Sequence, residues 1–102
     1  MIGFLLNQEA VVIPFRKETL GETLYDEPYY VKCRIDTGKK LVKAITVHGD
    51  VEAVVANAIM FVVQDEIIPP KSIVKGEYRE YVVIRCDEMR GFNKSHLEVY
   101  LE

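Results

Sequence analysis

Apolar and polar residues alternate along two stretches of the chain, 30–36 and 95–102. A period of two places every second side chain on the same face of an extended strand. Both stretches are therefore predicted to be half-buried strands, with Arg34 and Asp36 facing outward. The apolar members, predicted to face inward, are Val31, Cys33, Ile35, Leu97, Val99 and Leu101.

Three further stretches favour strands through their composition. Residues 80–86 are rich in β-branched side chains, and Pro14 ends the candidate strand 8–15 or moves it to a sheet edge. Residues 51–63 combine Ala and Met, which permit helix, with Val and Ile, which favour strand. We expect 51–63 to be mainly strand, either continuous or broken near Asn57.

Turn-forming residues separate these stretches, and no repeat or low-complexity segment interrupts them. We therefore predict one all-β domain over 1–102, a small antiparallel β-barrel or sandwich of about five to seven strands. Two segments lack a strand pattern. Residues 16–28 are predicted to form a polar loop, and residues 37–50 a long inserted loop that begins where Thr37-Gly38 ends a strand.

The predicted loop 37–50 also holds most of the basic residues of its region. Long loops on a small β-scaffold often carry function. A solvated face explains this charge run, and so does a local contact to phosphates or to an acidic partner. The residues concerned are Lys39, Lys40, Lys43 and His48.

The overall charge and the N-terminus exclude some classes of protein. The net charge of −3 and the pI near 5.4 argue against a general nucleic-acid coat, which is expected to be basic. No stretch approaches the ~20 apolar residues of a membrane-spanning helix. The first residues lack the basic start of a signal peptide. We expect a soluble protein made in the cytoplasm, with no membrane partner.

A metal site could be proposed from the thiols and imidazoles of the chain. No pair among them has the local spacing that zinc sites usually supply. Buried structural thiols explain both cysteines, so we predict no metal and no cofactor. The residues considered are Cys33, His48, Cys86 and His96.

The triplet Asp36-Thr37-Gly38 matches the active-site signature of aspartic proteases. A homodimer with one such triplet per chain would bring two carboxylates together to share a proton. Lys39 and Lys40 follow directly and would hold both carboxylates ionised, and 50–75 contains no glycine for a flap. A retropepsin-like protease is kept as an alternative, but we predict no catalytic residue.

An ordered series of segments fills the rest of the chain. "VKCRID" is followed by the polar "TGKKLVKAITVHGD", by "AVVANAIMFVV", by "DEIIPPKSIVKGEYREYVVIRCDEM" and by "NKSHLEVYLE". In this order and spacing, residues 29–102 resemble the small head-completion proteins of long-tailed bacteriophages. These are the head–tail connector or stopper proteins and the related minor capsid proteins. "LGETLYDEPYY" resembles the family's loop before the first long strand.

The resemblance implies a non-enzymatic virion protein that forms a homo-oligomeric ring, a dodecamer or hexamer, at the portal vertex. Such a ring joins head to tail, helps retain packaged DNA, and is assembled in the host cytoplasm. Its implied partners are the portal-adaptor proteins, a tail terminator or tail-completion protein, and the DNA in the channel. The family's inserted loop faces the channel, so the four basic residues of 37–50 become candidates for channel or DNA contacts.

A ring requires contacts between two different faces of each subunit, and tyrosines are enriched at such interfaces. A small bacterial β-barrel interaction module is the remaining alternative, and the neighbouring genes would separate it from a phage component. Our candidates for the subunit interface are Tyr29, Tyr30, Tyr100 and Leu101.

Overall fold

The structure is a computed structural model that describes residues 6–45, 49–64, 66–90 and 95–102. Every regular element in these residues is a β-strand. The strands are β1 (Gln8–Ile13), β2 (Phe15–Thr19), β3 (Glu22–Tyr25), β4 (Tyr29–Ile45), β5 (Val51–Val62), β6 (Ile73–Lys75), β7 (Glu80–Arg90) and β8 (Ser95–Leu101).

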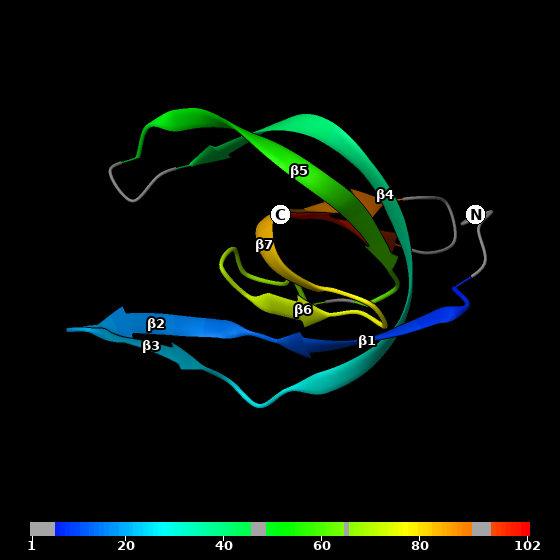
Figure 1. Cartoon of the computed structure of the whole chain (residues 1–102), viewed down its shortest axis with the longest axis horizontal. Helices are drawn as coiled ribbons and strands as arrows, with labels where there is room; N and C mark the ends of the chain where they lie inside the picture. Colours follow the sequence, from blue (N-terminus) through cyan, green and yellow to red (C-terminus); the bar gives the residue numbers. More distant parts are fainter. Residues whose placement is uncertain (1–5, 46–48, 65, 91–94) are drawn as a thin grey trace.

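Six of the strands close into a barrel in the order β1-β4-β5-β8-β7-β6, and every neighbouring pair is antiparallel (Figure 1). Closure removes the exposed strand edges along which chains can pair. Its shortest member, β6, has three residues and joins β1 to β7. The predicted all-β barrel is confirmed.

The barrel interior is filled by alternate residues of the strands. Cys33, Leu97 and Val99 are fully buried, and Ile35 packs against them from β4, as the period-two pattern predicted. Arg34 and Asp36 lie on the opposite, exposed face of β4. Among the described residues the other fully buried large side chains of this core include Val12, Met60, Ile68, Val74 and Leu101.

The predicted polar loop 16–28 is a two-stranded hairpin, so that prediction was wrong. Strands β2 and β3 pair only with each other and meet at a two-residue turn, Leu20-Gly21, where Gly21 has φ of 75°. A positive φ at the second turn position favours glycine. The strands are almost entirely exposed, so no buried face imposed an alternation of polar and apolar residues.

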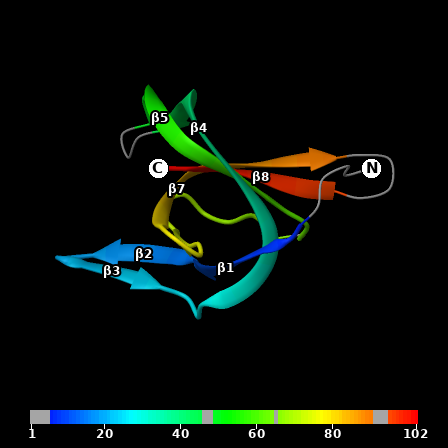
Figure 2. The same ribbon diagram turned by 45° about the vertical axis from the view of Figure 1, so that its right-hand side comes forward.

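Two contacts join this hairpin to the segment before β6, and a third joins its own two strands. The backbone N–H of Phe15 donates to Oγ of buried Ser72 at 2.8 Å, and the Phe15 and Tyr25 rings meet edge to face at 6.5 Å. Nζ of Lys71 lies 3.1 Å from a Glu18 carboxylate oxygen. The contacts leave the far end of the hairpin projecting from the barrel (Figures 1 and 2).

The predicted inserted loop 37–50 is also largely strand. Strand β4 does not end at Thr37-Gly38 but runs to Ile45, and β5 starts at Val51 and continues through Asn57 without a break. Residues 38–45 and 51–57 pair with each other beyond the part of β5 that pairs with β8. We call this two-stranded extension the arm.

A β-bulge marks the junction of barrel and arm. Thr37 pairs with Ala58 and Lys40 with Ala56, so β4 carries one extra residue there. Gly38 in the bulge has φ of 151°, which L side chains rarely adopt. The arm's inner face carries Lys40, Val42 and Ala44; its outer face carries Leu41 and Lys43. The two projections give the molecule extents of 42 × 28 × 26 Å.

Candidate interaction site

The basic residues predicted to form one loop patch lie on the β4 strand of the arm instead. Lys39 is in the bulge, Lys40 is on the inner face and Lys43 is on the outer face. His48 lies outside the described residues. Because a strand sends successive side chains to opposite faces, these lysines are not one surface.

Lys40 makes a structural contact within the chain. Its Nζ lies 5.5 Å from the centroid of the Tyr100 ring, at cation–π distance. Tyr100 is buried in a small cluster with Val42 and Ala56 of the arm, and burial raises the pKa of its hydroxyl. Lys40 and this cluster therefore hold the arm against β8 of the barrel.

The outer face of the arm is apolar and uncovered. Leu41 is paired with Val55 across the hairpin, and both side chains are exposed, Leu41 to 71%. Val51 is exposed as well, and Lys43 lies between these residues opposite Ala53. The arm thus presents apolar side chains on a face that the described residues of the chain leave exposed.

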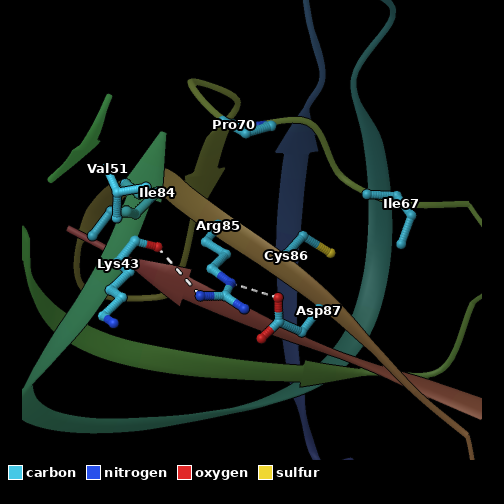
Figure 3. A pocket seen from close by; sticks show the side chains of 9 residues that line it. Lys43, Val51, Ile67, Pro70, Ile84, Arg85, Cys86 and Asp87 are labelled. Atoms are coloured by element: carbon cyan, nitrogen blue, oxygen red, sulfur yellow. Dashed lines mark hydrogen bonds and ion pairs between the residues drawn. The ribbon is translucent and has the colours of Figure 1, made fainter. Parts of the chain in front are cut away.

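A pocket of about 440 Å³ opens where the arm approaches the barrel (Figure 3). One wall comes from the arm, one from the connection between β5 and β6, and one from β7. Most of the lining is aliphatic, and the polar groups come from Lys43, Arg85 and Asp87. The lining residues are Lys43, Ala44, Val51, Ile67, Pro70, Ile84, Arg85, Cys86 and Asp87.

Arg85 ties the two sides of the pocket together. Its Nε donates to Asp87 Oδ1 at 2.7 Å, and a terminal nitrogen donates to the backbone carbonyl of Lys43 at 3.3 Å (Figure 3). The hydrogen bond to Asp87 is the main cause that raises the pKa of Arg85. The charge of Arg85 is therefore matched within the chain. In the described residues, no carboxylate lies within ion-pair distance of Lys43.

The structure separates the four predicted interface residues into two groups. Tyr30 is 81% exposed, whereas Tyr29 is half-buried and its hydroxyl accepts from Gln64 Nε2 at 3.1 Å. Leu101 is fully buried in the barrel core, and Tyr100 is buried beneath the arm. Leu101 and Tyr100 pack within the chain, so Tyr30 is the most accessible of the four candidates for a subunit contact.

Asp36 lies within β4, where Thr37 still pairs with Ala58, and not in a turn. Its carboxylate accepts from Nε of Arg34 at 2.9 Å, and both side chains are nearly half exposed. The triplet 36–38 therefore lies on a continuous strand and its bulge, with the Asp36 carboxylate paired to Arg34.

The thiols occupy two different environments. Cys33 is fully buried, and burial raises the pKa of its thiol to about 11. Cys86 is partly exposed in the pocket lining, where burial also raises the pKa of its thiol. Within the described ranges, no group of three or more His, Cys, Asp or Glu residues is placed to hold a metal.

Sequence reasoning missed both the pocket and the exposed end of the β2–β3 hairpin. The pocket is lined by residues from three separate parts of the chain, so no local sequence pattern predicts it. Leu20, at the hairpin turn, is 104% exposed. An apolar residue beside a glycine, in a segment of mostly polar residues, was the available signal.

We compared the chain with known proteins. No family model, no curated protein and no solved structure matches it significantly. In the part of the chain that is described, none of the elements is a helix long and apolar enough to cross a membrane.

Proposed function

We propose that this chain is a structural, non-enzymatic subunit of a ring at the portal vertex of a long-tailed phage, where it joins head to tail and helps retain DNA. The observation that carries the proposal is the division of the fold into a closed barrel and two projecting hairpins. A closed barrel is a rigid body, and projecting strands reach neighbouring subunits. The ordered resemblance of residues 29–102 to head-completion proteins supplies the phage context.

The surface of the projections supports an assembly role. The arm exposes Leu41, Val51 and Val55, and both of its outer strand edges lack pairing within the described residues. Unpaired edges and uncovered apolar faces are where chains associate. Lys39 and Lys43 on these strands keep the arm soluble before assembly, since charged residues discourage uncontrolled strand pairing.

The proposal is tested by adding the protein to the purified portal–adaptor complex of the phage genome that encodes it. Electron microscopy is expected to reveal an additional ring of density below the adaptor. The control is portal alone, to which no ring should add. A tight two-fold dimer of the free protein, with no binding to the complex, would contradict the proposal.

The neighbouring genes give an independent test. A portal or tail gene beside this one is expected for a connector subunit. A locus with neither would instead favour the small bacterial β-barrel interaction module, for which the same exposed arm would serve a different partner.

A further inference from the structure

Two features of the described residues have no role within the subunit. One is Leu20, whose side chain is fully exposed at the turn of the β2–β3 hairpin. The other is the mainly aliphatic pocket between the arm, β7 and the connection after β5. The two features have matching chemistry and lie on different elements of one chain.

The hairpin turn does not require a leucine. The conformational demand of the turn falls on Gly21, with its φ of 75°. The contacts that fix the hairpin are made by Phe15 at its base and by Glu18 two residues before the turn, while Leu20 itself is fully exposed. An isolated two-stranded hairpin is only marginally stable in water, so a contact at its end would stabilise it. Leu20 is the side chain best placed to make that contact.

The charges beside the two features are complementary. Glu22 is the cross-strand partner of Thr19 next to the turn, and it is exposed without an ion pair in the described residues. At the pocket, Arg85 is matched by Asp87, whereas Lys43 at the rim has no carboxylate within ion-pair distance in the described residues. In Figure 3 the amino group of Lys43 points away from Arg85, in keeping with its place on the outer face of the arm. An apolar tip beside an anion is therefore complementary to an apolar pocket with a cation at its rim.

We propose that the β2–β3 hairpin of one copy docks its Leu20 into this pocket on a second copy of the chain, with Glu22 beside Lys43 of that copy. The inference rests on the self-assembly in the proposed function and names the contact that produces it. The pocket, at about 440 Å³, exceeds one leucine side chain and leaves room for the turn backbone. A contact between different surfaces of identical chains propagates head to tail and closes into a ring when the rotation permits.

Cysteine crosslinking tests the contact directly, because Cys86 already lines the pocket. In Leu20→Cys, two thiols of different copies would release two protons and two electrons to dioxygen, with a copper catalyst, and form a disulfide. The reaction is run near pH 9 because burial raises the pKa of Cys86. We expect covalent dimers and higher multimers on a non-reducing gel. The buried Cys33 does not compete.

Two controls make the crosslink specific. Leu20→Cys combined with Cys86→Ser should lose the multimers, and Tyr78→Cys, which places a thiol on another exposed residue, should not give them. Covalent dimers that persist without Cys86 at the same yield would mean that hairpin tips meet each other and would overturn the proposal. Absence of any Cys86-dependent product would overturn it as well.

Affinity measurements by sedimentation equilibrium give a second readout. Leu20→Ser is expected to raise the dissociation constant of self-association at least about tenfold, since the lost burial is that of a whole leucine side chain. Leu41→Ser, the same change on the outer face of the arm, should have a smaller effect. Equal effects would contradict the assignment of Leu20 to the contact.

The charge pair is tested by reversal. Glu22→Lys and Lys43→Glu should each weaken association, and the double variant should recover most of the loss. Additive losses in the double variant would rule out the pairing of these two residues.

The contact and the proposed function can fail separately. If the Cys86-dependent crosslink forms but the protein does not bind the portal–adaptor complex, the contact is supported and the proposed phage function is contradicted. If a ring forms on the portal but the crosslink does not, the function is supported and the contact is contradicted.

Discussion

Strands β4 and β5 run through both the barrel and the arm, and their apolar side chains are buried in the first region and exposed in the second. In the barrel, the apolar face of these strands is fully enclosed, and Cys33, Met60 and Val62 are buried. In the arm, beyond the bulge, apolar residues such as Leu41 and Val55 face solvent. The buried residues of the barrel therefore stabilise the fold. The exposed apolar residues of the arm add little to that stability and are available for contacts with other molecules.

The largest expected difference in stability between the barrel and the arm is obtained by replacing one leucine with alanine in each. Leu101→Ala, in the barrel core, should lower the free energy of unfolding by about 2–5 kcal/mol, because it removes buried methyl groups and leaves a cavity. Leu41→Ala, on the arm, should change it by no more than about 0.5 kcal/mol. Urea denaturation of both variants measures the contrast. Similar losses would mean that the arm is part of the cooperative core.

The junction between the regions gives the next largest effect. Gly38→Ala should destabilise the protein by about 1–3 kcal/mol, because alanine must adopt a positive φ in the bulge. No neighbouring atom lies within 4 Å of the added methyl group, so the cost is conformational. Lys39→Ala, at the next residue, is the control and should be nearly neutral. An equally stable Gly38→Ala protein would contradict the bulge geometry.

Buried Cys33 makes barrel stability depend on pH. An unfolded thiol titrates near 9.0, whereas the folded-state pKa is about 11, so between these values the unfolded chain has lost a proton that the folded chain retains. The contribution is fully present below pH 9 and is lost as pH rises toward 11. Urea titrations at pH 8 and pH 11 should reveal a smaller loss in Cys33→Ala than in the native chain. Parallel losses would mean that this thiol is not the cause.

The smallest effect is expected at Asp36, on the exposed face of β4. Asp36→Asn should cost about 0–1 kcal/mol, because a solvent-exposed ion pair contributes little. The loss should shrink at high salt, and Arg34→Gln should match it, which denaturation at two salt concentrations would check. The same variant should leave any peptide-cleaving activity of a preparation unchanged; activity that vanished with it would revive the protease alternative.

The parts of the fold that sequence could predict are those with one buried face. Val31, Cys33 and Ile35 alternate with polar residues because the barrel interior covers one side of β4, and β8 shows the same pattern. The hairpin of β2 and β3 buries almost no side chains, so its sequence shows no alternation and was interpreted as a polar loop. Thr37-Gly38 resembled a strand end because a bulge and a turn use the same residues.

The candidate site was less predictable because distant segments build it. Tyr100 is buried in a cluster that includes Val42 and Ala56 of the arm, and nothing near Tyr100 in the sequence indicates that contact. Leu101 alternates with Leu97 and Val99, and this pattern correctly indicated that its side chain lies on the buried face of β8. The basic residues were found by composition, but their distribution over two faces followed from the continuation of β4 as a strand, which sends Lys40 and Lys43 to opposite sides.

The one-residue bulge at Gly38 also bears on how such a protein could change over generations. Because side chains alternate strictly along a strand, the extra residue of the bulge shifts the inward positions from Ile35 and Thr37 in the barrel to Lys40 and Val42 in the arm. Deleting one residue from the bulge would restore an unbroken alternation and leave Val42 inward and Leu41 outward. A single in-frame codon deletion at the bulge would thus preserve the arm's binding surface, whereas one just after Leu41 would move the following residues of β4 to the opposite face.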